Sequence, residues 1–181
     1  MFGTLIGKKK MTEETLAKVL VSGTLRTCEP IFKEVADYIS ECPHFESEPQ
    51  LKGDAELDFI ITVFTCNITR IPHYMDHGRD KRIAQKVLSQ LAESIELDLL
   101  DLSKRIQSCK SLMKRLNHPS KNLVYAMPKA LFDNYGLNEY QQSYFRDLRS
   151  PNPLYLKEMN QMLDHVVWDW DFLKNEYKFV E

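Results

Sequence analysis

The sequence predicts an all-α protein, a helical bundle of five or six main helices around one long central helix. Apolar residues recur every three or four positions over most of the chain, which is typical of amphipathic helices. The stretch from Arg79 to Leu116 contains neither proline nor glycine. Segments rich in β-branched residues are short and few. We therefore expect at least about 60% helix and no sheet of three or more strands.

Length and composition predict one globular domain. The chain has 181 residues, of which 43% are hydrophobic and 28% are charged, so it can bury a core and is too apolar for wholesale disorder. We expect residues 1–181 to form a single helical domain, with residues 1–11 as an N-terminal arm. A net charge of −2 gives no overall field that attracts nucleic acid, which is therefore not an expected partner.

Four cysteines lie far apart in the chain, and no two of them form a C-x-x-C pair. This spacing favours buried, reduced thiols over a disulfide framework or a metal-binding knuckle. Reduced thiols are typical of the cytosol. We accordingly expect a cytoplasmic protein.

The first ten residues combine apolar side chains with a basic triplet. Phe2, Leu5 and Ile6 precede Lys8 to Lys10. Because no run approaches the roughly 20 apolar residues that a spanning helix needs, no membrane span is expected. Three apolar residues and three lysines would support only a weak peripheral contact with an anionic membrane, through Phe2 to Lys10. The favoured interpretation is a short arm that packs on the domain or frays, and the membrane contact is the alternative.

Helix signals begin at Thr12, which can cap a helix whose first turn carries Glu13 and Glu14. The pair Ser22-Gly23 weakens this helix, and Pro30 is expected to begin a second one, since proline is tolerated in a first turn. Pro43 ends that second helix. Residues 43–54, with two prolines, a glycine and several acids, are the clearest loop in the chain.

The segment from Asp54 to Ile71 admits two interpretations. Its apolar residues fit a helix capped by Asp54. Its centre, Phe59 to Cys66, is rich in β-branched residues and could be a buried strand. The only candidate partner strand, Asn122 to Met127, is short, and one short pair would be a marginal sheet. A buried helix is therefore favoured.

Arg79 to Leu116 is predicted to form one very long helix, uninterrupted over most of residues 80–115. From Leu99 onward the apolar steps alternate between three and four, the spacing of a coiled-coil seam. At about 1.5 Å per residue the helix would measure about 57 Å, which exceeds the width of a compact domain of this size. It must bend or project, and Pro119 with the preceding Asn117-His118 stops it.

The remaining chain predicts a short helix from Pro128 to Tyr135, another that ends near Arg149, and a last helix that opens at Asn152-Pro153. Apolar residues at three-four spacing continue along this last helix to Tyr177.

Trp168, Phe172 and Phe179 fall on a second face of the last helix. Two interpretations follow. These aromatic residues pack against the first helix or the N-terminal arm, or they form a surface for a protein partner or a homodimer.

The densest group of possible metal ligands is His73, Asp76 and His77. On a helix the two histidines would share a face, and imidazole with carboxylate suits zinc or iron. However, Pro72 and Gly78 flank the group and indicate a loop between two helices. We therefore expect neither a metal nor another cofactor.

Two charged stretches are better explained as solvated faces. Ser103 to Lys121 is basic and lacks acids, which suits the end of a helix without any phosphate ligand. His165 and Asp169 lie four apart in an acidic stretch of the predicted last helix. Acids near a helix C-terminus are unfavourable, so a cation or a basic partner is the alternative there.

No nucleophile elbow, P-loop or dinucleotide fingerprint occurs in the chain. The favoured hypothesis is a non-enzymatic protein-interaction or regulatory protein. The alternative is a small helical enzyme or ligand-binding protein, with a pocket between helices fed by His73, Asp76, His77 or by the tyrosines at positions 125, 135, 140 and 144. The polar content of the core distinguishes the two hypotheses, since an enzyme should bury converging polar groups and an interaction protein should have a dry interior.

Overall fold

The computed structural model describes residues 8–181, and helices account for 70% of these residues. The predicted all-α class is confirmed. In chain order the elements are β1 (Lys9–Thr12), α1 (Glu13–Glu41), α2 (Ala55–Arg70), the 3-10 turn η1 (Ile71–His73), α3 (Arg79–Ser94), α4 (Leu99–Leu116), α5 (Met127–Asn134), η2 (Leu137–Tyr140), α6 (Ser143–Leu148), α7 (Pro153–Leu163), η3 (Asp164–Val166), α8 (Trp170–Glu176) and β2 (Tyr177–Val180).

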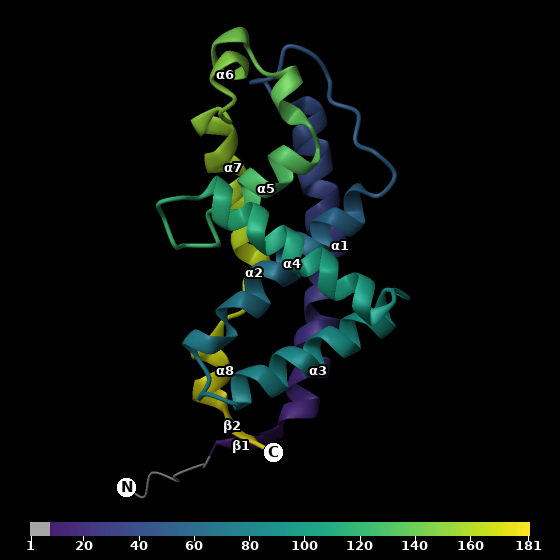
Figure 1. Ribbon diagram of the computed structural model, residues 1–181, viewed down its shortest axis with the longest axis vertical. Coiled ribbons are helices and arrows are strands. Elements are labelled where there is room, and N and C mark those ends of the chain that lie inside the picture. The colour runs from purple at the N-terminus through teal and green to yellow at the C-terminus, as the bar shows by residue number, and fades with distance from the viewer. Residues whose placement is uncertain (1–7) are drawn as a thin grey trace, which may run out of the picture.

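The helices stack along one long axis (Figure 1). Helix α1 runs along this axis and packs most extensively against α3, while α4 packs against α2 in the middle of the molecule. Helices α5 and α7 lie together toward one end, where α6 is found. The strands β1 and β2 lie side by side at the other end. The described chain thus has a helical end and a strand end.

Helix α2 is the buried centre of the bundle, which decides the ambiguity at residues 54–71 in favour of a helix. Phe59, Val63 and Phe64 are fully buried. The threonines that suggested a strand satisfy their hydroxyls inside the helix, since Thr62 donates to the carbonyl of Asp58 and Thr65 to that of Ile61. Such bonds allow β-branched residues in a helix that is buried on all sides from residue 61 to residue 67.

The prediction that Pro30 begins a new helix is wrong, because α1 continues through it. Proline removes one backbone hydrogen bond and leaves the carbonyl four residues earlier, at Arg26, without its partner. Both Arg26 and Pro30 are exposed, so water can replace the missing bond. Buried residues on both sides, such as Thr24 and Val35, hold the helix together across this point.

The prediction of one uninterrupted helix over residues 80–115 is also wrong. Helix α3 ends at Ser94 and α4 begins at Leu99. The amide of Leu97 donates to the carbonyl of Ala92 and that of Glu96 to Glu93, which is the Schellman pattern of a helix end. Glu96 takes the left-handed conformation, with φ 53°, where glycine is usual. The sequence thus lacks glycine, the usual signal of a helix end, at this position.

The predicted last helix is interrupted as well. Helix α7 stops at Leu163, residues 167–169 are not helical, and α8 begins at Trp170. Asn67 of α2 fixes this interruption, because its side chain donates to the carbonyl of Val166 and accepts from the amide of Trp168. These tertiary bonds replace the intrahelical bonds that a continuous helix would make.

The acidic stretch that looked unfavourable is explained by this break. Asp169 caps the N-terminus of α8 and accepts from the amide of Phe172, and Asp171 lies in the same first turn. Acids are favourable at a helix N-terminus. His165 lies in η3, so it shares no helix with Asp169, and no compensating cation or partner is needed.

Strands β1 and β2 are parallel and join the two ends of the described chain, with Met11 opposite Phe179. The two-stranded sheet was not predicted, since Tyr177 was assigned to a helix. Of the arm expected at residues 1–11, the structure describes only Lys8 onward. Phe2 to Gly7 lie outside the described residues. Among residues 8–181, no helix has both the length and the apolar character needed to span a bilayer.

Candidate functional site

His73, Asp76 and His77 lie in the connection between α2 and α3, and all three are exposed. The carbonyl of Asp76 accepts from the amides of Arg79 and Asp80, so this residue begins the next helix. Within residues 8–181, no three histidine, cysteine, aspartate or glutamate side chains lie close enough to hold a metal ion.

Trp168 is buried in the non-helical segment between η3 and α8, with 8% of its surface exposed. Its indole Nε1 donates to Thr24 of α1 at 2.7 Å. Its ring packs edge-on against Phe64 of α2 and against Trp170. Trp168 therefore faces the core, in contact with the first helix.

The three aromatic interface candidates do not form the continuous stripe that a single helix would have given them. Phe172 projects from α8 and is 57% exposed. Phe179 lies in β2, half-buried against the core opposite Met11. The premise of one aromatic helix face is thus corrected by the break after Leu163. An interface through the exposed Phe172 stays a prediction.

Two groups of buried polar side chains hold segments of the fold together. Glu13, at the start of α1, is buried and accepts from Arg82 at 2.7 and 2.9 Å and from Arg79 at 3.3 Å. The hydrogen bonds from Arg82 hold the pKa of the Glu13 carboxyl below its ordinary value. Gln141 donates to Asn138 and to the carbonyl of Ser150, and accepts from the amide of Asn152. Each group joins two segments of the chain.

All four cysteines are buried and unbridged. Burial raises the pKa of Cys28 and Cys66 to about 12, and burial also raises that of Cys109. Such thiols stay protonated at neutral pH and are poor nucleophiles.

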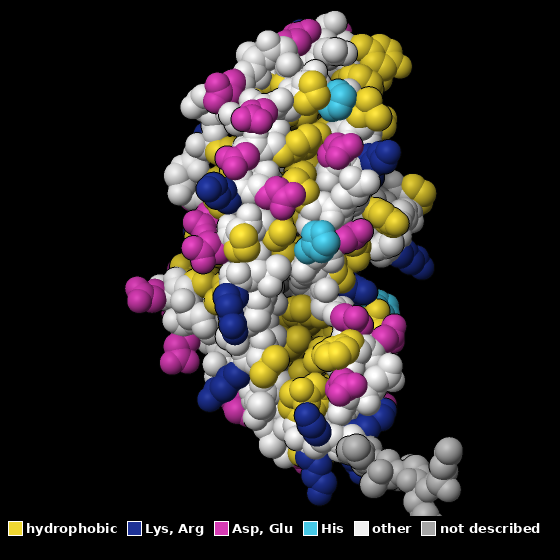
Figure 2. Space-filling model, turned by 180° about the vertical axis from the view of Figure 1, so that it is seen from behind, with side chains coloured by type: hydrophobic (Ala, Val, Ile, Leu, Met, Phe, Trp, Pro, Cys, Tyr) yellow, Lys and Arg dark blue, Asp and Glu magenta, His cyan; other side chains and the backbone are white. Residues whose placement is uncertain are grey.

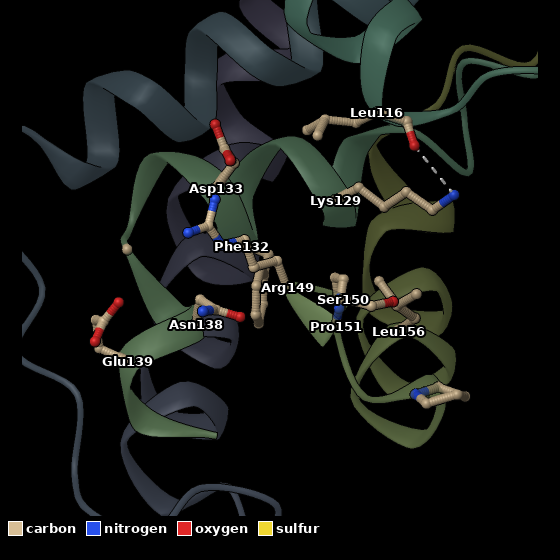
Figure 3. A pocket seen from close by; sticks show the side chains of 12 residues that line it. Leu116, Lys129, Phe132, Asp133, Asn138, Glu139, Arg149, Ser150, Pro151 and Leu156 are labelled. Carbon is tan, nitrogen blue, oxygen red and sulfur yellow. Dashed lines mark hydrogen bonds between the residues drawn. The ribbon is translucent and has the colours of Figure 1, made fainter. Parts of the chain in front are cut away.

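A cleft of about 630 Å³ lies beside α5 and α7, near the helical end (Figure 3). Its volume is within the range of small-molecule sites. Phe132, Leu116 and Leu156 give it apolar walls. The polar side chains that line it are Lys129, Asp133, Asn138, Glu139, Arg149 and Ser150.

Two cations line this cleft, and their side chains extend in different directions (Figure 3). The Lys129 ammonium donates to Asn117 Oδ1 at 3.0 Å and reaches the last carbonyl of α4, at Leu116, at 3.5 Å. Arg149 follows α6 in the left-handed conformation, with φ 50°. Neither cation forms an ion pair with another residue of the described chain.

The most exposed apolar side chains of this region lie next to the cleft, on α6 and the first turn of α7. Tyr144 is 68% exposed, Leu148 is 59% and Leu154 is 55%. We call these three residues the α6 surface. Tyr144 and Leu148 are four positions apart, so they share one helix face. Hydrophobic side chains reach the surface at this end in Figure 2.

Helix α6 contributes no buried residue to the core, yet it is held firmly. The carbonyl of Arg146 accepts from Asn138, and its guanidinium reaches Glu46. Gln141 fixes the segments before and after the helix through Asn138, Ser150 and Asn152. Hydrogen bonds between polar side chains and the backbone therefore hold the α6 surface in place.

Sequence reasoning placed Tyr144 at a possible pocket and did not single out Leu148, Leu154 or Arg149. Two apolar residues four apart normally indicate the buried face of a helix. Only the placement of α6 at the end of the molecule shows that this face is exposed.

The basic stretch from Ser103 to Lys121 covers the outer side of α4. Lys104, Arg105, Lys114 and Arg115 are exposed, opposite the buried Leu102, Ile106 and Met113. Lys114 and Arg115 lie in the last turn of α4, where cations are favourable without a ligand. The stretch thus has the geometry of a solvated helix face.

Comparison with known proteins gives no similarity to use: the chain matches no family model, no curated protein and no solved structure.

Proposed function

We propose that this protein is a non-enzymatic helical interaction protein, which binds a protein partner through the α6 surface. The observation that carries the proposal is an exposed tyrosine–leucine pair on a helix that contributes nothing to the core. Within the chain the Tyr144 ring packs edge-on against Phe145 alone among the aromatic rings of residues 8–181, and Tyr144 and Leu148 stay mostly exposed, so most of their apolar surface is free to contact a partner.

The chemistry of the α6 surface supports a protein partner. Tyrosine is enriched at interface hot spots, because it contributes a large apolar ring at a low cost in conformational entropy. Arg146 and the exposed Asp147 and Arg149 surround the apolar pair with polar groups, the usual anatomy of an interface rim. The polar scaffold of Gln141 keeps the surface rigid, which lowers the entropy lost on binding.

The interior supports the non-enzymatic class. The buried Asn67 and Gln141 are occupied by hydrogen bonds that join segments of the chain. Glu13, the buried carboxylate, is neutralised by two arginines at the start of α1. Residues engaged in this way are not available as an acid, a base or a nucleophile.

The alternative is a ligand-binding protein that uses the cleft beside α5 and α7. Its support is Arg149, which occupies a left-handed position that glycine fits better and lines the cleft without a carboxylate partner in the described chain. Backbone strain of this kind is often retained where a side chain has a function. Such a ligand would carry an acidic group to meet Lys129 or Arg149 and a hydrogen-bond donor to meet Asp133 or Glu139, which line the same cleft.

Quantitative affinity purification from the native cell tests the proposal. The variant Tyr144→Ser/Leu148→Ser should lose its partner, by about thirtyfold or more in affinity once that partner is purified, if the pair is a hot spot. The matched control is Tyr125→Ser/Leu100→Ser, which replaces the same two residue types at 55% and 63% exposure elsewhere. Circular dichroism checks that both variants fold.

A protein counts as the partner only if the control retains it and the α6 variant loses it. Measuring the mass of the protein in solution tests whether the partner is a second copy of the chain. Equal capture by all three proteins would contradict the proposal. Loss of a small ligand in Arg149→Gly, with no partner lost in the α6 variant, would favour the alternative.

A further inference from the structure

Five lysines gather at the strand end of the molecule, opposite the α6 surface. They come from three segments that only the fold brings together, namely the β1 region, α8 and β2. All five are exposed, and Lys and Arg side chains collect at this end in Figure 2. We call this group the lysine end; its members are Lys8, Lys9, Lys10, Lys174 and Lys178.

The ammonium groups of the lysine end have no anionic partner in residues 8–181, although other cations of the same end do. Arg82 is paired with Glu13 and Glu181, and Lys86 with Glu14. Lys8 donates to the backbone carbonyl of Lys174. Glu176, between Lys174 and Lys178 in the sequence, forms an ion pair with neither of them within residues 8–181. The five ammonium groups are thus left without a direct ion pair, in a chain whose net charge is −2.

The register of the sheet makes this arrangement costly within the chain. Lys10 lies directly opposite Lys178 in the parallel pair, while Met11 and Phe179 turn to the other face, toward the core. Neighbouring strands are about 4.8 Å apart, and like charges placed directly opposite repel each other. An anionic surface outside the chain would relieve this repulsion.

The composition and shape of the lysine end indicate which anionic surface. All five cations are lysines, which act as hydrated point charges, whereas shaped recognition of carboxylates and nucleic-acid phosphates favours arginine. Five clefts in residues 8–181 lie elsewhere, and none of these five is lined by the lysines. Flexible charges without a cleft fit a flat, continuous anionic surface. In the sequence, Phe2, Leu5 and Ile6 immediately precede Lys8, a pattern typical of membrane contact.

We propose that the lysine end docks on the anionic headgroups of a membrane surface, leaving the α6 surface at the far end free for its partner. The contact is electrostatic and reversible. Each lysine near an acidic membrane changes the partition coefficient by about fivefold, so five lysines reach a coefficient on the order of 10³–10⁴ M⁻¹. The proposal does not depend on the proposed function of the α6 surface.

Co-sedimentation of the full chain with lipid vesicles tests it. Vesicles of phosphatidylcholine and phosphatidylserine, in a ratio of about two to one, should bind the protein, and vesicles of phosphatidylcholine alone should not. Raising NaCl from about 0.1 M to about 1 M shortens the Debye length from about 10 Å to about 3 Å and should release it. The variant Lys10→Gln/Lys178→Gln should bind about 25-fold more weakly.

The matched control is Lys52→Gln/Lys157→Gln, which removes the same charge from exposed positions outside the lysine end. It should bind like the wild type. Because Lys10→Gln/Lys178→Gln relieves a like-charge pair, it should unfold at the same temperature as the wild type or higher, so lost binding cannot be assigned to misfolding. Equal binding of the two variants would overturn the proposal. So would tighter binding to duplex DNA or to polyglutamate than to the acidic vesicles at the same salt.

Discussion

Single residues at contacts between distant segments hold this fold together. Trp168, Asn67 and Glu13 each connect parts of the chain that lie at least 66 positions apart. Such a residue can be identified only from its contacts in the folded structure. Its neighbours in the sequence do not distinguish it from a surface residue. Two predictions follow at this scale.

Trp168→Ala should lower the free energy of unfolding by about 3–5 kcal/mol, the usual cost of removing a buried aromatic side chain. The variant also leaves the Thr24 hydroxyl without the indole donor. Chemical denaturation measures the loss, and light scattering should show an unchanged mass in solution. A stability equal to that of the wild type would mean that Trp168 does not belong to the core, and a dimer turned monomer would show that it belongs to an interface.

Glu13→Gln should lower the free energy of unfolding at pH 7 by about 1–2 kcal/mol, the smaller end applying because Arg79 and Arg82 are partly exposed and can be solvated. The folded pKa of Glu13 lies below its ordinary value of 4.5. Its stabilisation is therefore present above pH 4.5 and is lost as the pH falls through the lower, folded pKa.

Denaturation at a series of pH values from neutral to about pH 3 tests the sign. The difference between the wild type and Glu13→Gln should shrink as the pH falls, which separates Glu13 from the other carboxylates present in both proteins. A difference that stays constant or grows on acidification would contradict the assigned role of the ion pair.

At the scale of elements, helix ends are set by bonds that the hydrophobic period does not reveal. Helices α3 and α6 both end in a Schellman pattern with a residue other than glycine in the left-handed position, namely Glu96 and Arg149. Asp98 then caps α4 by accepting from the amides of Leu100 and Asp101. The break at residues 95–98 was thus encoded by a capping aspartate without the usual glycine.

Glu96→Gly should raise the free energy of unfolding by up to about 1 kcal/mol, because glycine takes the left-handed conformation without the clash of a Cβ atom. Arg149→Gly should give a similar gain. Urea denaturation measures both. Glu96→Ala is the control, since alanine keeps the Cβ atom, and a gain in that variant as large as in Glu96→Gly would refute the conformational explanation.

At the scale of the whole molecule, the elongated bundle separates two different surfaces. The apolar α6 surface lies at one end and the lysine end at the other. This separation would let the protein contact a partner and an anionic surface at once, without competition between them. It is an arrangement suited to an adaptor.

The purified protein should carry no stoichiometric transition metal. His73, Asp76 and His77 are exposed on one short connection, and two histidines with one carboxylate in solvent lack the second shell that orients ligands. Elemental analysis measures the content. About one zinc or iron per chain, lost in His73→Ala/His77→Ala, would overturn this prediction.

Three features could be predicted from the amino-acid sequence: the helical class, the buried character of Phe59 to Cys66, and the capping role of Thr12, which accepts from the amide of Thr15. These features depend on local energetics, namely the period of apolar residues and the satisfaction of nearby backbone groups. These local contributions involve residues only a few positions apart, so they can be predicted from a short stretch of sequence.

The breaks in the long helices and the exposure of particular apolar faces depend on contacts between distant parts of the chain. The last helix is interrupted because Asn67, about a hundred positions away, bonds the backbone beside Trp168. The Tyr144–Leu148 face is exposed because α6 lies at the end of the bundle, where no other element covers it. The lysine end forms because β1 pairs with β2 across the whole chain. Local periodicity carries no information about such distant partners, so these features follow from the fold.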